Sequence, residues 1–263
     1  TSGSTTTGAV GATTTYSLTC AGTGGSTSKS ATVTVASGAA SRFPLRVEAG
    51  KRYLVDAQGR PFLMHGDTPW CLITQLTETE VDQYLEDRRV KGFNTILIEL
   101  IESLYSDNAP RNVYGDAPFA TGADFATRNE AYFSHAEYVI ARAREKGMLV
   151  LVTPAYLGYN GGSQGWYQEM GQAGNTVLQD YGRYVATRFH GGDYYPPDRA
   201  RMRAIVNGIL EIETTRLHTF HGERSTAALE WLGTGETWLD VNNIYTTKST
   251  VIAEAQGEYT RST

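Results

Sequence analysis

The chain has 263 residues, of which 40% are hydrophobic and 19% charged, and its formal net charge is −5. This length suffices for one large domain, or for a large domain with a smaller piece attached. The acidic balance and the lack of any Lys/Arg run argue against nucleic acid or an anionic membrane as a partner. No apolar stretch has the length of a transmembrane helix. Because the sequence shows neither an initiator Met nor a signal peptide, we expect a mature product or a cut piece.

The cysteines give no sign of a disulfide or a metal site. Cys20 and Cys71 lie in segments of different composition, so we do not pair them. No cluster of Cys and His has the spacing of metal ligands, and no metal or cofactor is predicted. Cys71 also lacks the neighbouring His that a cysteine nucleophile requires, so we expect it to be a buried apolar residue.

Residues 1–36 consist almost entirely of Thr, Ser, Gly, Ala and Val. Two alternating runs, at 14–20 and 30–35, flank a polar loop at 22–26 and predict a β-hairpin. A disordered low-complexity tail is the alternative interpretation of the same composition. The small residues at 37–42 predict a linker to a larger domain, which we place at residues 43–263.

From residue 43 onward, apolar strands alternate with amphipathic helices. Strands that are apolar throughout are covered by helices on both sides, so the pattern predicts a parallel β/α fold. The loops at 100–128 and 154–174 are too long for simple connections and predict parts of a site. The predicted elements are a hairpin over 45–56, strands at 61–65, 94–99, 148–153, 217–220 and 238–242, and helices at 77–91, 129–146, 175–189, 199–210, 225–232 and 247–261.

Polar and aromatic residues gather where the predicted strands end. In a (β/α)8 TIM barrel these ends form the active face, so we predict that the side chains there bind a ligand. Trp70 has packing at the barrel rim as its alternative role, whereas Glu99, a charge that ends a buried strand, needs a partner. His65 lies within a predicted strand and is interpreted as a core histidine. The candidates are Asp67, Trp70, Glu99, His221, Asn242, Asn243 and Tyr245.

The segment 190–198 is a loop rich in Gly and Pro that also carries a histidine, two aspartates and two tyrosines. Side chains of these types bind sugars and transfer protons. We interpret Asp193 as a candidate catalytic carboxylate, and His190 and Tyr194 as substrate-binding residues. Asp198 is interpreted instead as the cap of the helix at 199–210.

Motifs from residue 42 to the end resemble, in the same order, those of the apiosidase-like glycoside hydrolases. The resemblance implies a (β/α)8 barrel that hydrolyses glycosidic bonds in plant cell-wall polysaccharide, with apiose-containing pectin as the type substrate. It therefore also implies a secreted protein. The motifs include Phe43-Pro44-Leu45, Gly59-Arg60-Pro61-Phe62, Gly66-Asp67-Thr68-Pro69-Trp70, His190-Gly191-Gly192-Asp193 and Trp238-Leu239-Asp240-Val241-Asn242.

The resemblance further implies a mechanism with two carboxylates. Asp193 matches the general acid/base that follows strand 4 in the family, and the nucleophile, a Glu after strand 7, is expected beyond Thr263. Glu254 and Glu258 lie near that point but fit the helix at 247–261, so we expect them to be solvated helix charges.

One departure from the family predicts an incomplete barrel. The family has a strand that runs directly into Gly-Gly-Asp, whereas here the predicted helix at 175–189 meets His190 with no strand between. Either residues 184–189 unwind into the fourth strand, or Asp193 does not reach the site. With strand 4 missing or rebuilt and the C-terminal units absent, we expect an inactive fragment.

The N-terminal hairpin resembles the last strands of a bacterial immunoglobulin-like β-sandwich, through its Tyr16-x-Leu18-x-Cys20 pattern. The resemblance implies that residues 1–36 are part of such a sandwich, with the partner of Cys20 before residue 1. Together with the missing nucleophile, this leaves open a second function, that of a non-catalytic carbohydrate-binding or adhesive protein. A metal-assisted hydrolase on a different barrel is the third hypothesis.

Overall fold

The computed structural model describes residues 14–33, 42–158, 163–189, 193–194, 199–220, 226–233, 235–247 and 249–261. They belong to two compact units, Thr1–Ser41 and Arg42–Thr263. Within the described ranges, no helix is both long enough and apolar enough to cross a membrane.

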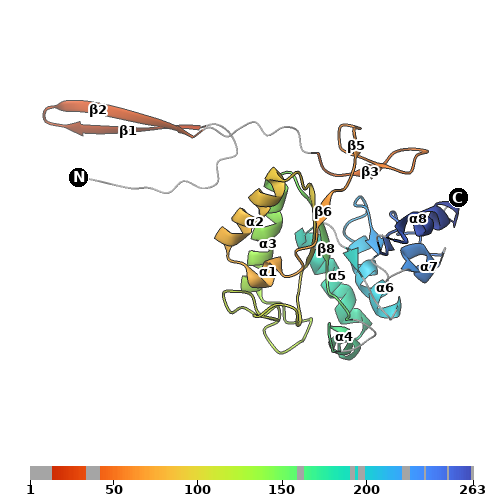
Figure 1. Cartoon of the computed structure of the whole chain (residues 1–263). Helices are drawn as coiled ribbons and strands as arrows, with labels where there is room; N and C mark the ends of the chain where they lie inside the picture. Colours follow the sequence, from red (N-terminus) through yellow and green to blue (C-terminus); the bar gives the residue numbers. More distant parts are fainter. Residues whose placement is uncertain are drawn as a thin grey trace. The chain divides into compact units, whose positions relative to one another are not determined.

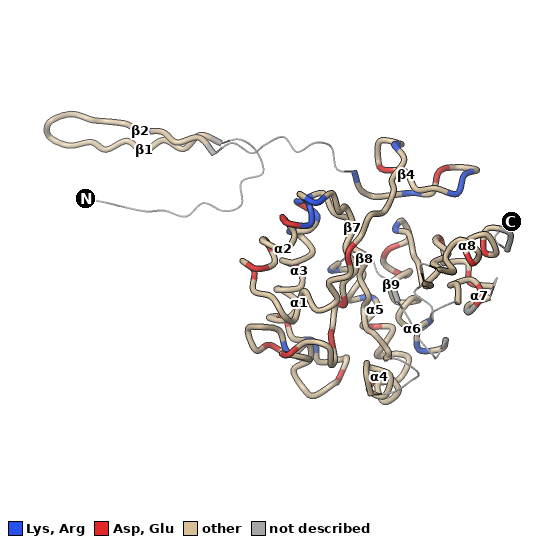
Figure 2. Tube along the Cα trace, in the orientation of Figure 1, with Lys and Arg blue, Asp and Glu red and all other residues tan. Residues whose placement is uncertain are grey.

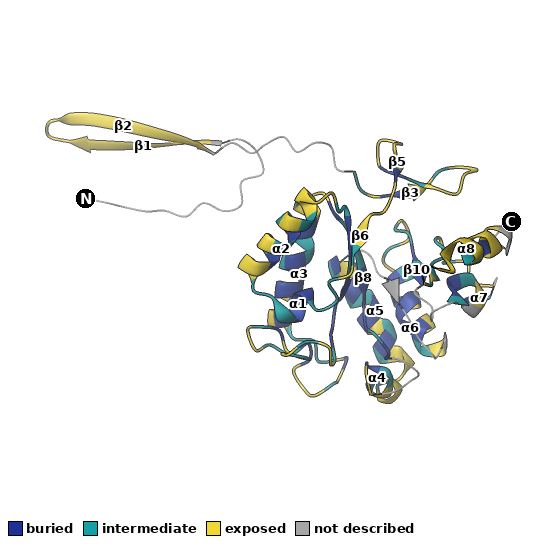
Figure 3. Cartoon of the chain, in the orientation of Figure 1, coloured by how far each residue is buried: buried dark blue, intermediate teal, exposed yellow. Residues whose placement is uncertain are grey.

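The smaller unit contains an antiparallel hairpin (Figure 1). Strand β1 (Thr14–Gly22) pairs with β2 (Gly25–Val33) from end to end, with Gly22 opposite Gly25. The predicted hairpin is confirmed, although its loop is limited to residues 23–24. All side chains described in it are exposed (Figure 3), so the described hairpin buries no core of its own. That it belongs to an immunoglobulin-like sandwich stays a prediction.

The larger unit begins with a small antiparallel sheet, made of β3 (Arg46–Val47), β4 (Leu54–Val55) and β5 (Pro61–Phe62). The buried carboxylate of Asp56 fixes the turn between β4 and β5, because it accepts hydrogen bonds from the backbone N–H groups of Gln58 and Arg60 and from the Arg60 side chain. Burial opposes ionisation, but these bonds outweigh it and lower the pKa of Asp56 to about 2.

An arc of parallel strands follows. β6 (Gly66–Asp67), β7 (Thr95–Glu99) and β8 (Leu149–Thr153) form one parallel sheet, in which β7 and β8 pair along their whole length. β9 (Asp193–Tyr194) lies against β8 and pairs in parallel with β10 (Thr219–Phe220). Thr219 of β10 is bridged in turn to Val241. The predicted parallel β/α fold is thus confirmed.

Helices alternate with these strands along the chain and pack beside them (Figure 1). Neither α1 nor α4 is predicted by the sequence pattern, because both are short and lie within long loops. A small antiparallel pair, β11 (Thr226–Ala227) and β12 (Ile244–Tyr245), adjoins α7. The helices are α1 (Leu72–Gln75), α2 (Glu78–Val90), α3 (Glu130–Glu145), α4 (Tyr167–Ala173), α5 (Asn175–Phe189), α6 (Arg199–Leu210), α7 (Ala228–Leu232) and α8 (Val251–Arg261).

Local signals set the ends of two long helices. Thr77 and Glu80 form the predicted capping box at the start of α2. Asn129 caps α3 by accepting a hydrogen bond from the Ala131 N–H. Figure 2 shows basic and acidic positions side by side at the C-terminal end of α2, where Arg89 pairs with Glu86. Basic residues there also suit the negative end of the helix dipole.

The first strand of the arc starts later than predicted. The predicted strand at 61–65 is divided, since Pro61–Phe62 belongs to the antiparallel sheet and β6 begins at Gly66. His65 falls between them, is exposed, and stacks on Phe93 with ring centroids 4.4 Å apart. The interpretation of His65 as a core histidine is therefore wrong.

The described part of the fourth strand does not come from the segment considered for it. Residues 184–189 remain helical as the end of α5, so their unwinding does not occur. The strand is β9 itself, with Asp193 opposite Thr219 and Tyr194 opposite Phe220.

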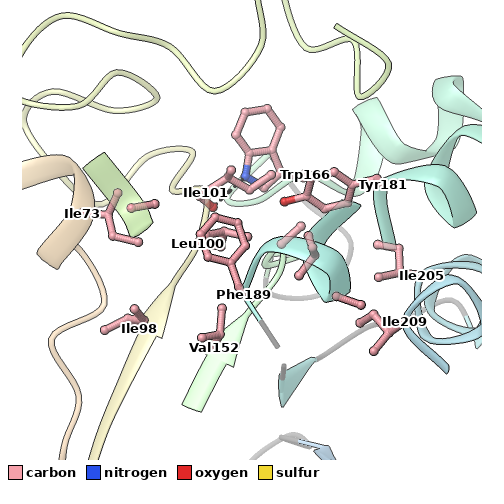
Figure 4. Close-up of a cluster of buried hydrophobic side chains, with 14 of the residues drawn as sticks. Ile73, Ile98, Leu100, Ile101, Val152, Trp166, Tyr181, Phe189, Ile205 and Ile209 are labelled. Carbon is pink, nitrogen blue, oxygen red and sulfur yellow. Dashed lines mark hydrogen bonds between the residues drawn. The ribbon is translucent and has the colours of Figure 1, made fainter. Parts of the chain in front are cut away.

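One hydrophobic core joins the strands to the helices (Figure 4). Ile98 of β7, Val152 of β8 and Tyr181 of α5 belong to the same buried cluster. The Tyr181 hydroxyl donates to the Pro154 carbonyl at 2.7 Å, and the indole N–H of Trp166 also donates to a backbone carbonyl. These bonds allow large aromatic side chains to be buried without an unpaired polar atom.

Helices α5 and α6 approach each other through two glycines. A Cβ atom at Gly182 would lie 2.2 Å from the Ile205 carbonyl oxygen, and one at Gly208 would lie 2.0 Å from the Gln179 carbonyl oxygen. Both contacts are with backbone, which has little room to move. The close packing of these two helices therefore depends on the absence of side chains at Gly182 and Gly208.

We predict that Gly182→Ala and Gly208→Ala each destabilise the protein by about 2 kcal/mol or more, because the added methyl group forces the helices apart. Gly257→Ala is the matched control: Gly257 lies in α8 with no atom near its missing Cβ. Alanine there should be neutral or stabilising by up to about 1 kcal/mol. Chemical denaturation measures all three, and equal effects at the three positions would contradict the packing argument.

Candidate functional site

The carboxyl ends of β6, β7 and β8 bring three aromatic side chains together, which we call the aromatic trio: Trp70, Tyr105 and Tyr156. Each follows a different one of these strands. The ring centroids of Trp70 and Tyr156 are 5.0 Å apart, and that of Tyr105 lies 6.2 and 6.3 Å from them. Tyr105 is 48% exposed and the other two are half-buried, so the trio presents an aromatic surface to solvent.

The two phenols of the trio keep their protons. Burial, followed by the charges of Glu102 and Glu99, raises the pKa of Tyr105. Burial and the neighbouring Tyr105 raise the pKa of Tyr156 to about 12. The Tyr105 hydroxyl donates to the side-chain oxygen of Gln164 at 3.3 Å. Both tyrosines are therefore neutral donors at physiological pH.

Two buried carboxyl groups lie next to the trio. Glu99 ends β7, Glu102 follows in the next turn, and each is 1% exposed. Glu102 accepts hydrogen bonds from the backbone N–H groups of residues 103, 104 and 105, at 2.7, 2.8 and 3.0 Å. The Cys71 thiol also donates to it, at 3.8 Å. These donors hold the Glu102 side chain in one position at the carboxyl end of the sheet.

The carboxyl group of Glu99, unlike that of Glu102, receives no hydrogen bond from the described residues. Neither of its carboxyl oxygens has a hydrogen-bond partner among the described residues. Burial, and then the charge of Glu102, raise the pKa of Glu99 well above its ordinary value of 4.5. Glu99 therefore keeps its proton at pH values where an exposed glutamate has lost it. At 1% exposure it also lies beneath the surface, so the predicted contact with substrate would require its covering side chains to move.

The carboxylate of Asp67 is bound by other groups of the protein. Its carboxylate accepts hydrogen bonds from the Tyr84 hydroxyl at 2.8 Å, from Arg88 at 2.9 Å and from the Thr68 N–H at 2.8 Å. Burial opposes its ionisation, but these bonds outweigh it and lower the pKa of Asp67. Because Tyr84 and Arg88 lie on α2, Asp67 fastens β6 to that helix.

Asn242 is also held by the protein itself. Its amide oxygen accepts from the Leu229 N–H at 2.8 Å, and its amide N–H donates to Glu258 at 2.9 Å. Asn242 thus bridges α7 and α8. Glu258 is 7% exposed, which corrects the expectation that it is a solvated helix charge. Tyr245 lies in β12 and is 38% exposed.

The remaining predicted site residues are only partly described. Asp193 and Tyr194 are placed by their backbone, as β9 next to β10. This puts Asp193 within the fourth strand, at the level of Thr219, rather than after the end of the strand. His190, His221, Asp198 and the side chains of Asp193 and Tyr194 lie outside the described residues.

Sequence reasoning missed three members of this site, Glu102, Tyr105 and Tyr156. The available signal was their position, since each lies a few residues after a strand of the predicted sheet, in a loop already marked as too long for a connection. Within the described part of the chain, no group of three or more His, Cys, Asp or Glu side chains could hold a metal ion.

Parallel strands alternate with helices, and carboxyl and aromatic side chains lie at the carboxyl ends of the strands, which is the end where β/α-barrel proteins as a class hold their ligands. The model of the apiosidase-like catalytic domain matches residues 48–262, and the chain belongs to this family. The resemblance read from the sequence motifs is thereby confirmed.

Solved structures agree at the level of the fold. A structure titled "Glycoside hydrolase" shares 26% identity with a TM-score of 0.62, over 75% of this chain and 45% of its own. A family 5 glycoside hydrolase from Bacteroides vulgatus shares 24% identity with a TM-score of 0.63, over 75% and 43% of the two chains. An endo-1,4-beta-mannanase from Rhizomucor miehei shares 14% identity with a TM-score of 0.50, over 73% and 63%. The chain therefore spans less than half the length of the first two, and no curated protein matches it.

The pH dependence of stability tests the state of Glu99. Since its pKa is raised on folding, its favourable contribution is complete below pH 4.5 and is lost as the pH rises through the raised pKa. Glu99→Gln, which has no charge to bury, should therefore be more stable than the unmodified protein by at least about 1 kcal/mol at pH 8, and the gain should vanish at low pH.

Glu130→Gln serves as the control, because the pKa of Glu130 is shifted in the opposite direction on folding. Hydrogen bonding to Arg188 lowers the pKa of Glu130, so its contribution is present at neutral pH and is lost as the pH falls. Urea denaturation from pH 4 to pH 8 gives both comparisons. A gain for Glu99→Gln that does not change with pH would show that Glu99 does not titrate as described.

Thiol reactivity tests the surroundings of Cys71. Burial and the charges of Glu102 and Glu99 raise its pKa to about 12, so almost none of it is thiolate at pH 8. Iodoacetamide at pH 8 should modify the exposed Cys20 and leave Cys71 unmodified in the folded protein. Mass spectrometry of the peptides reads the result, and equal labelling of both cysteines would contradict the described surroundings.

Proposed function

We propose that this domain acts in the hydrolysis of glycosidic bonds in plant cell-wall polysaccharide of the pectin type, outside the cell. The observation that carries the proposal is the aromatic trio beside Glu99 and Glu102, at the strand ends where β/α barrels hold their active sites. Membership in the apiosidase-like catalytic family supports the same conclusion.

Each component of the trio suits a sugar. The rings of Trp70 and Tyr156 meet at 60°, so a sugar whose apolar face packs on one of them has the edge of the other beside it. The neutral phenols of Tyr105 and Tyr156 donate hydrogen bonds to hydroxyl or ring oxygens. A polysaccharide is bound by repetition of such contacts, and the exposed Tyr105 leaves room for a second sugar ring.

The proposed chemistry uses two carboxyl groups. Asp193 protonates the oxygen of the leaving sugar, while a glutamate that follows strand 7 in the family attacks the anomeric carbon from the opposite face. A water, deprotonated by Asp193, then releases the covalent intermediate. The resemblance puts the glutamate past residue 263, so we propose that this chain by itself binds oligosaccharide without cleaving it.

A non-catalytic carbohydrate-binding protein is the second candidate. The trio and its supporting carboxyl groups are complete without Asp193, so they could retain a sugar with no reaction following. The two candidates agree on where the sugar lies. They differ on whether supplying the rest of the barrel brings activity.

The deciding experiment compares the chain with a chimera that receives the last barrel units of the 26%-identical glycoside hydrolase structure. Both are incubated with a panel of pectin oligosaccharides, and products are separated by chromatography. We expect cleavage by the chimera only, and its loss in Asp193→Asn. If the chimera folds and binds sugar but cleaves nothing, the hydrolase function is refuted and the function of a carbohydrate-binding protein takes its place.

Sugar affinity should depend on the trio. We expect Trp70→Ala to weaken binding of a pectin oligosaccharide about tenfold, because the stacking surface is lost, which corresponds to about 1.4 kcal/mol. Tyr53→Ala is the control, since Tyr53 is also aromatic and is 47% exposed, but lies next to β4 and outside the trio. Isothermal titration calorimetry measures both affinities. An unchanged affinity in Trp70→Ala would show that the trio is not part of the sugar-binding site.

A further inference from the structure

The aromatic trio lies beside a buried negative charge, that of Glu102. This carboxylate is 1% exposed. One of its oxygens accepts the backbone N–H of Tyr105 at 3.0 Å, and the other accepts the thiol of Cys71, the residue after Trp70, at 3.8 Å. The charge is therefore fixed next to the surface that Trp70 and Tyr105 present to solvent.

The loops that carry the trio contain no positive charge to compensate Glu102. They follow β6, β7 and β8, and the sequence has neither Lys nor Arg in residues 68–87, 92–110 and 147–182. Burial, and then the charge of Glu102, raise the pKa of Tyr105, so the trio lies in a negative electrostatic field. Because solvent screens a buried charge only weakly, this field also acts on a ligand that lies on the trio.

Glu99 adds a second carboxyl group that a positive charge would stabilise. It is also 1% exposed, and neither of its oxygens has a hydrogen-bond partner among the described residues. A cation nearby favours the ionised form of such a group and offsets the repulsion between Glu99 and Glu102. An anion on the trio would instead be repelled by Glu102 and would leave Glu99 uncompensated.

The aromatic rings themselves also attract a cation. No two ring centroids of the trio are more than 6.3 Å apart, so one cation can lie within about 6 Å of all three, the range over which the face of Trp or Tyr attracts positive charge. The ring planes are inclined to one another at 72°, 60° and 51°, so the trio is not flat. The rings and the buried carboxyl groups therefore favour the same charge of ligand.

We propose that the trio selects its sugar by charge, and that it binds a sugar with a positively charged amino group in preference to the neutral sugar and to the uronate. The inference rests on the proposed function, because it takes the trio to hold a sugar, and it goes further by naming the charge of that sugar. In a pectin chain, the uronates would lie outside the trio and a neutral sugar would lie on it.

The test compares the methyl glycosides of galactosamine, galactose and galacturonate at pH 6, where the amine is protonated and the uronate is ionised. NMR titration of the whole chain follows the indole N–H signal of Trp70, which is assigned by its loss in Trp70→Phe. We expect the galactosaminide to bind about fivefold or more tightly than the galactoside, and the galacturonide to bind more weakly than either.

The outcomes separate this inference from the proposed function. Equal affinities for the three glycosides, or tightest binding of the galacturonide, would overturn the selection by charge and leave the sugar site in place. Binding of none of them at Trp70 would refute the sugar site itself. Choline carries an ammonium group without a sugar ring. If choline binds at Trp70 and the galactosaminide does not, the site takes a simple organic cation and the proposal of an amino sugar fails.

Charge variants identify the source of the preference. Glu102→Gln keeps an acceptor oxygen but removes the charge, so the ratio of the galactosaminide and galactoside affinities should fall toward one. Glu145→Gln, which removes an exposed carboxylate paired with Arg142 at the end of α3, is the matched control and should leave the ratio unchanged.

A surface variant decides if Glu102→Gln fails to fold. Leu104 is 53% exposed and precedes Tyr105, so Leu104→Lys should lower the same ratio by adding a positive charge beside the trio, whereas the neutral Leu104→Gln should not. An unchanged ratio in both Glu102→Gln and Leu104→Lys would overturn the proposal.

Discussion

The pairing of β7 with β8 is the interaction on which the larger unit depends. It joins two apolar strands along their whole length, with α2 and α3 sharing the core that they form. The same pairing brings Glu99 beside Thr153, and the parallel pairing of β6 with β7 brings Trp70 to the same end of the sheet, close to Tyr156. Burial of Glu99 follows from this arrangement, and so does its raised pKa. The pairing of β7 with β8 thus forms the centre of the hydrophobic core and also positions Glu99 at the carboxyl end of the sheet.

The two ends of the strands have different characters for a physical reason. At the carboxyl ends, loops of the chain supply donors to buried polar groups, as residues 103–105 do for Glu102. At the amino ends, Val150 and Val152 of β8 line a cavity whose other lining residues are mainly apolar. The carboxyl ends of the strands are therefore lined by polar groups, whereas the amino ends enclose a mainly apolar space.

Much of this fold follows from sequence patterns, and the failures have identifiable causes. Capping and periodicity predict α2, α3, α5 and α6, because those signals act within a few residues. The prediction of a single strand at 61–65 fails because an apolar run does not reveal with which neighbouring strand it pairs. Within the site, Trp70 and Glu99 were predicted from their place after strands, but the partners of Asp67 and Asn242 lie on distant helices. Glu102 and the tyrosines of the trio were missed because loop conformation, which brings them to the sheet, has no periodic signal.

The central claim is that the carboxyl ends of β6, β7 and β8 form the sugar site. A crystal structure of the chain soaked with a pectin oligosaccharide tests it most directly. The account predicts a sugar ring packed on Trp70 or Tyr156, with a hydroxyl or ring oxygen within 3.5 Å of a tyrosine hydroxyl, a usual hydrogen-bond range. An oligosaccharide bound elsewhere, with the aromatic trio untouched, would contradict it.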